Sequence, residues 1–338
     1  MVVFRAAYVP ITLVLLLSLA CQSAEVPSAD GNATSADAST TGPPPVLATN
    51  AFYYYDDVDA AWAFYTETIG LHTVVDYGFA KILRVAESSY LTLVNAADGM
   101  HATDEPKTVT LAFVTEQVEG WYDYLSSQGV SMRSEFRPAE GRPHDGFVAI
   151  DPEGYLLEFE RFNPHAENER LMPALAEGEV LYPAPGAQTN WPADLGLQAT
   201  VLWLYYRDME RMERFYTETL GHEIIVDQGW AKVFAVSSAG YVGLVDGARG
   251  LHHATDDKSV TVSFFTDDVQ GWFDYMHQIE GWEFRTEELS EESGRVSTFV
   301  GYDPEGYFLE WDTLLDVGGN EELLELLREQ CGEVCSGA

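Results

Sequence analysis

Basic residues are scarce in this chain. Its 338 residues include 18 lysines and arginines but 55 aspartates and glutamates, which gives a net charge of −37 and an isoelectric point near 4.2. A field of that sign repels nucleic acids and anionic membrane surfaces, so we expect neither as a partner. The surplus of acids is typical of a strongly hydrated surface, and by itself it indicates no specific cationic ligand.

Long apolar runs are also lacking, apart from one at the N-terminus. After Arg5 the chain is mostly apolar up to Ala20. The run is shorter than the roughly 20 apolar residues that a membrane-spanning helix needs, and it has the size of a signal-peptide core. We therefore expect residues 1–20 to be a signal peptide that directs export.

The residues around the end of this run indicate how the exported chain is held. Ser18-Leu19-Ala20-Cys21 resembles a bacterial lipobox, although lipoboxes usually carry Leu where this chain has Ser18. The resemblance implies acylation of Cys21 and a lipid anchor in the cell envelope, on the periplasmic side. Small residues before Cys21 also fit ordinary cleavage, which would give a soluble periplasmic protein. Residues 21–47 are rich in Ser, Ala, Thr and Pro, and a disordered tether of this kind favours the anchored form.

Cysteine is rare as well, with three residues in the chain. If Cys21 is acylated, Cys331 and Cys335 remain as an even pair in an oxidising compartment. Four residues apart in an intact helix they would not reach bridging geometry, but Gly332 lies between them and could unwind that turn. A disulfide and a pair of free thiols therefore both stay open.

Beyond the tether the chain repeats itself. Residues 57–70 match residues 208–221, and both contain Phe-Tyr-Thr-Glu-Thr. The octet Asp-Pro-Glu-Gly-Tyr-Leu-Leu-Glu at 151–158 returns at 303–310 with a single change. Because the offset is nearly constant and far longer than a solenoid repeat, it indicates two copies of a whole domain.

Each copy is predicted to hold two βαβββ units, on the evidence of alternating strands and capped helical stretches. The octet is a turn, since proline and glycine supply its backbone angles, and the strand behind it points Leu156, Glu158 and Glu160 to one face. We expect domains at 48–162 and 198–316, a proline-rich extended connector at 163–197, and a C-terminal helix and tail at 317–338.

The two repeated motifs, in this order, resemble those of the vicinal oxygen chelate superfamily, which includes glyoxalases, bleomycin-resistance and fosfomycin-resistance proteins and extradiol dioxygenases. The resemblance covers about residues 48–162 and 198–315. It implies an α+β fold of tandem glyoxalase-like domains, in which paired βαβββ units form a half-open mixed β-barrel around a cavity.

Enzymes of that superfamily usually hold a divalent metal with a His on the first strand of a unit and a carboxylate on the last strand. The carboxylate positions hold Glu158 and Glu310. The remaining ligand positions hold Asn50, Thr92, Thr110, Val201, Gly243 and Thr261. Because one strong ligand per domain cannot retain a catalytic metal, we expect no cofactor. A divalent metal stays possible in a rearranged catalytic site, where His101 and His252 would join the two glutamates.

Aromatic residues and two lysines on the predicted strands are candidates for binding a small molecule. Aromatic side chains on the concave face would line an apolar pocket, although strand aromatics are often plain core. A lysine aimed into the cavity would bind an anionic group or pair with a glutamate, whereas an outward lysine would be solvated. The candidates are Tyr54, Lys81, Trp203, Tyr205, Trp230 and Lys232.

Three functions follow from these observations. The first is binding of a small molecule in two cavities without the usual metal. The second is a metal-dependent, glyoxalase-like lyase or dioxygenase with the rearranged His and Glu site. The third is a structural or interaction module whose barrels are filled by their own side chains. In each case the only membrane contact expected is the N-terminal lipid anchor.

Overall fold

The computed structural model describes residues 42–138, 141–183, 192 and 194–332. The signal peptide, Cys21, most of the tether and Cys335 lie outside these residues, so the predictions for them stay predictions. None of the helices in the described ranges is long and apolar enough to cross a membrane.

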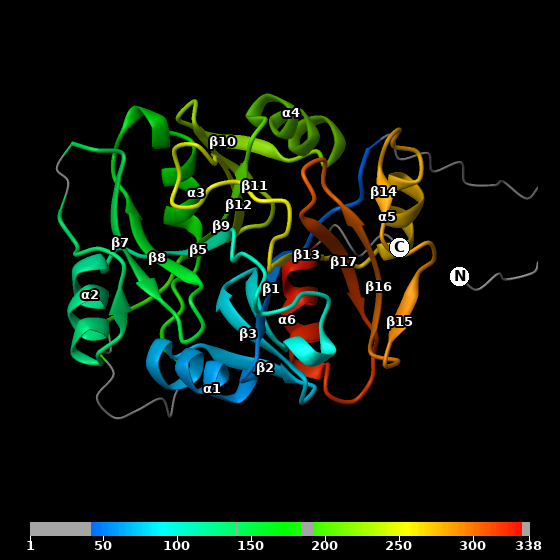
Figure 1. The fold of residues 1–338 in the computed structure, drawn as a ribbon, viewed down its shortest axis with the longest axis horizontal. Helices are drawn as coiled ribbons and strands as arrows, with labels where there is room; N and C mark the ends of the chain where they lie inside the picture. The colour runs from blue at the N-terminus through cyan, green and yellow to red at the C-terminus, as the bar shows by residue number, and fades with distance from the viewer. Residues whose placement is uncertain (1–41, 139–140, 184–191, 193, 333–338) are drawn as a thin grey trace, which may run out of the picture. The chain divides into compact units, whose positions relative to one another are not determined.

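Four units follow one another along the chain (Figure 1). Unit 1 comprises β1 (Ala48–Tyr55), α1 (Val58–Ala63), β2 (His72–Asp76), β3 (Ala80–Ala86) and β4 (Ser89–Asn95). Unit 2 comprises β5 (Val109–Val114), α2 (Val118–Ser127), β6 (Ser131–Met132), β7 (His144–Ile150) and β8 (Leu156–Phe162). Unit 3 comprises β9 (Ala199–Tyr206), α4 (Met209–Arg214), β10 (Glu223–Asp227), β11 (Ala231–Ala235) and β12 (Gly240–Asp246). Unit 4 comprises β13 (Thr261–Phe265), α5 (Val269–Met276), β14 (Glu283–Phe284), β15 (Ser290–Glu292), β16 (Val296–Tyr302) and β17 (Phe308–Leu314).

The first helix of each copy begins and continues as its sequence requires. The Asp57 side chain accepts a hydrogen bond from the Ala60 amide and so caps α1. The helix widens into a π-helical turn at Phe64–Ile69 and stops at Gly70, whose φ of 85° suits glycine. The second copy repeats the cap with Asp208.

The sequence predicts an extended connector between the copies, but part of the connector is helical. It contains α3 (Leu171–Glu177). Pro173 lies in the first turn of this helix, where a backbone N–H has no partner within the helix and its loss costs little. The C-terminal helix α6 (Glu321–Cys331) follows β17, and Leu323 and Leu327 on its apolar face are buried.

The strands form two open sheets, and each sheet takes one unit from each copy. Units 1 and 4 form one sheet, called sheet 1/4, with the order β14-β16-β17-β13-β1-β4-β3-β2 and with β15 paired to β16. Units 2 and 3 form the other, called sheet 2/3, with the order β10-β11-β12-β9-β5-β8-β7-β6. The units meet where first strands pair antiparallel, β1 with β13 and β5 with β9. The expected α+β fold of paired, half-open βαβββ units is confirmed. Each unit pairs with a unit of the other copy, unit 1 with unit 4 and unit 2 with unit 3.

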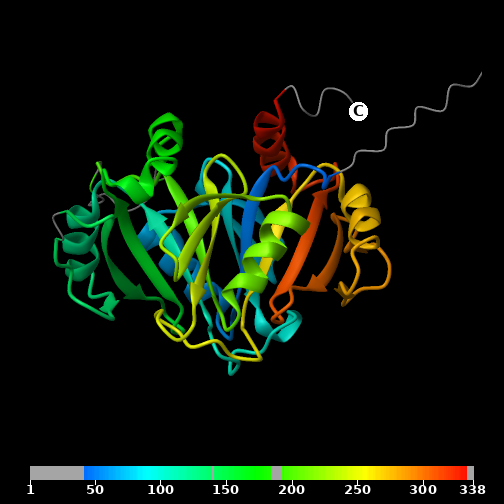
Figure 2. The same ribbon diagram turned by 90° about the horizontal axis from the view of Figure 1, so that it is seen from above.

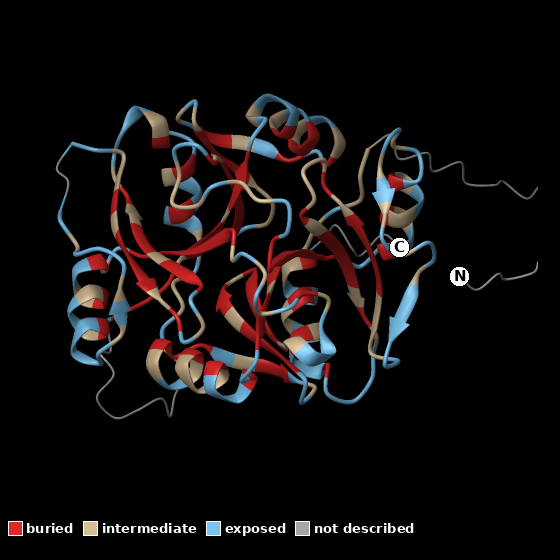
Figure 3. Ribbon diagram, in the orientation of Figure 1, coloured by how far each residue is buried: buried red, intermediate tan, exposed pale blue. Residues whose placement is uncertain are grey.

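Strand alternation separates a helix-covered core from a concave face. Tyr155, Leu157 and Phe159 lie in the core, while Glu158 and Glu160 line a cavity on the other side, which confirms the alternation predicted after the octet. The first strands at the centres of the sheets are almost entirely buried (Figure 3). In both ribbon views the strands lie between α2 and α5 (Figure 2).

The repeated octet joins the two sheets. Asp151 accepts hydrogen bonds from the Tyr55 hydroxyl at 2.7 Å and from the Tyr155 amide at 2.8 Å. The Tyr155 hydroxyl donates to the Ser259 carbonyl at 2.7 Å and accepts from the Tyr54 amide at 3.0 Å. Tyr54 lies in β1, and Ser259 lies in the loop just before β13, so both partners belong to the side of sheet 1/4. In the second copy, Tyr307 makes the corresponding bonds to Thr108 and Tyr205 of sheet 2/3. The aspartate and the tyrosine of the octet therefore have a structural role.

Candidate functional site

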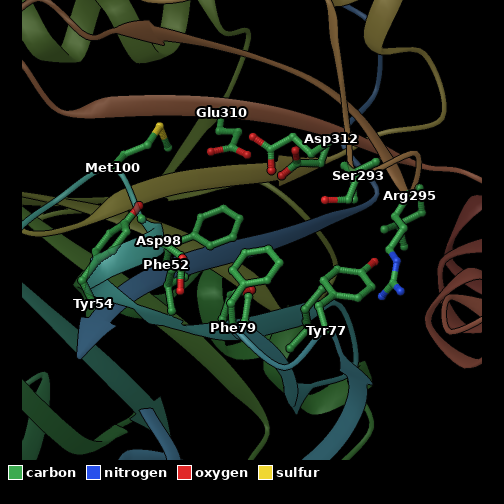
Figure 4. A pocket seen from close by; sticks show the side chains of 18 of the residues that line it. Phe52, Tyr54, Tyr77, Phe79, Asp98, Met100, Ser293, Arg295, Glu310 and Asp312 are labelled. Carbon is green, nitrogen blue, oxygen red and sulfur yellow. The ribbon is translucent and has the colours of Figure 1, made fainter. Parts of the chain in front are cut away.

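Each sheet holds one cavity on its concave face. The cavity of sheet 1/4, the first cavity, has a volume of about 360 Å³. Its walls come from units 1 and 4 (Figure 4). Among the lining residues are Phe52, Tyr54, Tyr77, Phe79, Glu310 and Asp312.

The second cavity, in sheet 2/3, lies at the equivalent place and measures about 260 Å³. The repeat relates its aromatic walls and its two acids to those of the first cavity. Its lining residues include His144, Glu158, Glu160, Trp203, Tyr205 and Trp230. Each copy thus supplies the aromatic wall of one cavity and the acid pair of the other.

Two neighbouring carboxyl groups form the floor of the first cavity. Glu310 and Asp312 are 4% and 2% exposed. Ser263 donates to Asp312 at 2.6 Å, and Thr298 donates to Glu310 at 3.3 Å. Within the described chain, Oε2 of Glu310 and Oδ1 of Asp312 receive no hydrogen bond.

Burial shifts the ionisation of this pair toward the protonated form. It raises the pKa of Asp312 to about 6. The pKa of Glu310 rises well above its usual range, first through burial and then through repulsion by Asp312 and Glu292. Since the two carboxyls are close enough to hydrogen-bond once one is protonated, burial and their mutual repulsion both favour a proton shared by the pair.

The second cavity repeats this arrangement with different neighbours. Burial raises the pKa of Glu158 to about 7, and burial together with Glu158 raises the pKa of Glu160 well above its usual range. The nearby Trp203 indole lowers the pKa of Glu160 and so opposes this rise. Even so, neither the indole N–H nor Oε1 of Glu160 completes a hydrogen bond among the described residues.

Comparison with protein families decides the classification of the chain. The model of the Glyoxalase/Bleomycin resistance protein/Dioxygenase superfamily matches residues 48–159 and 197–311. The chain belongs to this superfamily. A comparison with curated proteins gave no match.

Solved structures of glyoxalase-superfamily folds resemble the whole two-copy body. Glyoxalase I from Zea mays is 15% identical, with a TM-score of 0.55 over 85% of this chain and 96% of the maize chain. A proposed dioxygenase from Bacillus subtilis is 14% identical, with a TM-score of 0.58 over 87% of this chain and 95% of its own. At such identities the likeness shows the shared fold alone.

The strand register tests the predicted metal-ligand positions. The residues beside Glu310 and Glu158 are Ser263 and Ala112, each two residues beyond the predicted Thr261 and Thr110. In sheet 1/4, Glu310 lies in register with Ser263, and Ser263 lies in register with Asn50. In sheet 2/3 the row that contains Glu158 continues through Ala112 and Val201. Across the described ranges, no three His, Cys, Asp or Glu side chains are grouped to hold a metal ion. The donors present do not fit the usual metal centre of glyoxalase-superfamily enzymes.

An aromatic ring occupies the space beside one of these positions. The Trp203 ring lies so close to Gly243 that a Cβ at residue 243 would clash with it. In the first cavity the equivalent of Trp203 is the smaller Phe52, and Thr92 replaces the glycine. The Trp203 ring thus fills part of the floor of the second cavity.

The two predicted histidines lie behind the cavity walls rather than in them. The His101 ring packs 4.9 Å from the ring of Tyr54, and its Nδ1 is 2.7 Å from Glu105. The His252 ring packs 5.0 Å from the ring of Tyr205, and burial lowers its pKa to about 4. Neither histidine lines a cavity with Glu158 or Glu310, so the structure does not assemble the rearranged His and Glu site.

The two predicted lysines do not reach the cavities. Lys81 Nζ lies 3.0 Å from Asp76, and Lys232 Nζ lies 2.6 Å from Asp227. Both lysines are on the helix-covered side of their strands, where they also approach an acid of α1 or α4. Strand alternation explains this placement, because Ala80 and Ala231, one residue earlier, face the cavities.

The four predicted aromatics do line the cavities. Tyr54 belongs to the first cavity, and Trp203, Tyr205 and Trp230 belong to the second. Sequence reasoning missed Asp312, Glu160 and His144 as cavity residues, and it also missed Arg249 and Arg295. For the two acids a signal existed, since each lies two residues beyond a predicted glutamate on the same face of a strand.

Proposed function

We propose that this protein binds small organic molecules in its two cavities, without the metal centre of its superfamily. The observation that carries the proposal is the first cavity, which has a volume of about 360 Å³. In it an apolar aromatic wall faces two buried carboxyls, each with one oxygen that accepts no hydrogen bond from another described residue. Small-molecule sites have this composition and span roughly 300–1,000 Å³. Such a volume counts against a purely structural role, in which side chains would fill the barrel.

Ligand binding can be tested with a pair of matched cavity-filling variants. Val94 and Val245 are repeat equivalents that line the first and second cavities. A fragment screen by ligand-observed NMR should give hits on the wild-type protein. Val94→Phe should remove one group of hits and Val245→Phe the other, while circular dichroism shows both variants folded. An absence of hits on the wild-type protein, or hits untouched by either variant, would contradict the proposal.

The alternative of a metal-dependent enzyme rests on Glu158 and Glu310, which stand where the superfamily's last-strand carboxylate ligand stands. Elemental analysis of protein purified from the exporting host separates the two functions. We expect far less than one Fe, Mn, Ni or Zn per chain. Stoichiometric metal that is lost in Glu158→Gln or Glu310→Gln would instead favour a glyoxalase-like lyase or a dioxygenase.

We also propose that the protein works on the cell envelope, held by an acylated Cys21 at the end of the tether. The lipobox-like Ser18 to Cys21 and the polar tether support this location. Cell fractionation should find the wild-type protein with membranes and Cys21→Ala in the soluble periplasmic fraction. A wild-type protein that is already soluble would favour ordinary signal-peptide cleavage.

A further inference from the structure

We propose that the first cavity selects organic cations, namely a flat aromatic group that carries an amidine, guanidine or protonated amine. This inference rests on the proposed ligand-binding function and names the class of ligand for one of the two sites. It follows from the floor, the walls and the charge balance of the first cavity.

The floor of the cavity needs hydrogen-bond donors. Among the described residues no other side chain or backbone group donates to Oε2 of Glu310 or Oδ1 of Asp312, although both side chains are more than nine-tenths buried. The one hydrogen bond between the two carboxyls requires a proton on one of them. Ser263 and Thr298 donate to the other carboxyl oxygens. Figure 4 shows both carboxyls facing the hollow that the aromatic rings enclose. A buried acceptor without a donor is costly, and a ligand with N–H groups would remove that cost.

The walls favour a flat and positively charged ligand. Phe52, Tyr77 and Phe79 line the side opposite the acids, and Phe79 is exposed at the mouth. Aromatic faces attract cations and stack on flat rings. A ligand between this wall and the floor would have its charge against the acids and its ring against the aromatics.

The charge balance of the lining excludes most anions. Asp98, Glu292, Glu310 and Asp312 are its acids, and Arg295 is its one cation among the described residues. The Arg295 guanidinium packs 4.8 Å from the centre of the Tyr77 ring. It forms no ion pair with Glu310 or Asp312, and in Figure 4 it lies beyond Tyr77 from them. Even with a shared proton on the floor, the lining carries more negative than positive charge.

Binding of a cation would displace the shared proton of Glu310 and Asp312 into solvent. The charge of the ligand replaces the charge of the proton, and its N–H groups replace the single O–H bridge. Affinity should therefore rise with pH, and calorimetry in buffers of different ionisation enthalpy should detect proton release. The titratable groups that interact with this pair are Glu292, Tyr54 and Tyr77, and Ser263 and Thr298 donate hydrogen bonds to it.

The test compares two probes of equal shape and different charge, 2-naphthamidine and the neutral 2-naphthamide. Met100 lines only the first cavity, so the resonance of its ¹³C-labelled methyl group reports binding there. At pH 8 the amidine should bind about tenfold or more tightly than the amide. Glu310→Gln combined with Asp312→Asn should cut this preference to less than about threefold while the amide still binds.

A control pair removes the same charge from side chains that line neither cavity. Asp123→Asn with Glu325→Gln changes two exposed acids and should leave the preference for the amidine intact. If this control also abolishes the preference, the long-range field of the acidic protein is responsible and the inference fails. If the double cavity variant does not fold, Asp312→Asn alone should still weaken the amidine more than the amide.

The remaining outcomes separate the inference from the function on which it rests. Equal binding of both probes, or tighter binding of the anion 2-naphthoate, would overturn the preference for cations and leave ligand binding in place. Failure of both probes to shift the Met100 resonance would also overturn the preference for cations. Whether the protein binds small molecules at all would then be decided by the fragment screen alone.

Discussion

Replacement of Asp303 by Ala is expected to lower the free energy of unfolding by about 3–5 kcal/mol. This buried carboxyl accepts hydrogen bonds from the Tyr206 hydroxyl at 2.7 Å and from the amides of Glu305 and Tyr307 at 2.9 Å each. Alanine leaves the two amides without this acceptor, and it leaves the Tyr206 hydroxyl with only the Tyr216 hydroxyl, 3.3 Å away. It also frees Tyr307, whose hydroxyl joins the two sheets. Urea unfolding followed by circular dichroism measures the loss.

Two controls show whether the octet acts as this joint. Asp151→Ala removes the equivalent carboxyl of the first copy and should cost a similar amount, because its bonds are the same. Asp123→Ala, on the exposed face of α2, should change stability by less than about 0.5 kcal/mol. A loss below about 1 kcal/mol for both octet variants would contradict the structural role given to the motif.

The octet also shows how a strong sequence signal is misread. Its repetition and its acids draw attention as a candidate site, and the turn and the alternating strand behind it are predictable from residue types. Its hydrogen bonds are not predictable, because Tyr54, Ser259 and Thr108 approach it only after the sheets have formed. The aspartate and tyrosine of the motif hold the fold, and the cavity uses the glutamate at the end of the octet.

The pairing of units across the copies could not be deduced from the chain alone. The first strands β1 and β9 are repeat equivalents, as are β5 and β13, so either pairing presents similar residues to the sheet. The sequence therefore predicts the units and their concave faces but leaves the partner open. For the same reason it predicts separate cavities for Glu158 and Glu310 but not which aromatic wall faces each glutamate.

The lysines illustrate a limit of periodicity. Both faces of β3 and β11 are buried, so apolar residues surround Lys81 and Lys232 on either side and no contrast marks the cavity face. An acid at the end of the preceding strand and an acid of the first helix of the same unit then fix each lysine on the helix side. Such local ion pairs are visible only once the turn and the helix are placed.

Stability should depend on pH in the direction opposite to that of an ordinary salt-bridged acid. The pKa of Asp312 is raised to about 6 in the folded protein, from 3.8. Its contribution is thus fully present below about pH 4 and is lost as the pH rises through about 6. A difference of about two pKa units corresponds to about 3 kcal/mol, so this is the second large effect that the structure predicts.

Asp312→Asn isolates this effect, since asparagine keeps an oxygen that can accept the hydrogen bond from Ser263 but cannot ionise. Relative to wild type, the variant should gain about 2–3 kcal/mol in the free energy of unfolding between pH 4 and pH 8. The comparison cancels the contributions of other groups, such as His252, whose lowered pKa costs stability as the pH falls. Urea unfolding at pH steps across this range gives the curve.

Asp227→Asn supplies the matched control with the opposite sign. Asp227 is half exposed, and its hydrogen bonds with Lys232 and the Gly229 amide hold its pKa below the usual value. Its contribution is present above the unfolded pKa and is lost only as the pH falls below about 4, so between pH 4 and pH 8 the stability of this variant should run nearly parallel to that of wild type. Parallel curves for the two variants would show that burial of the acid pair does not govern the profile. Diverging curves would show that ionisation of the buried acid pair costs stability in the folded protein.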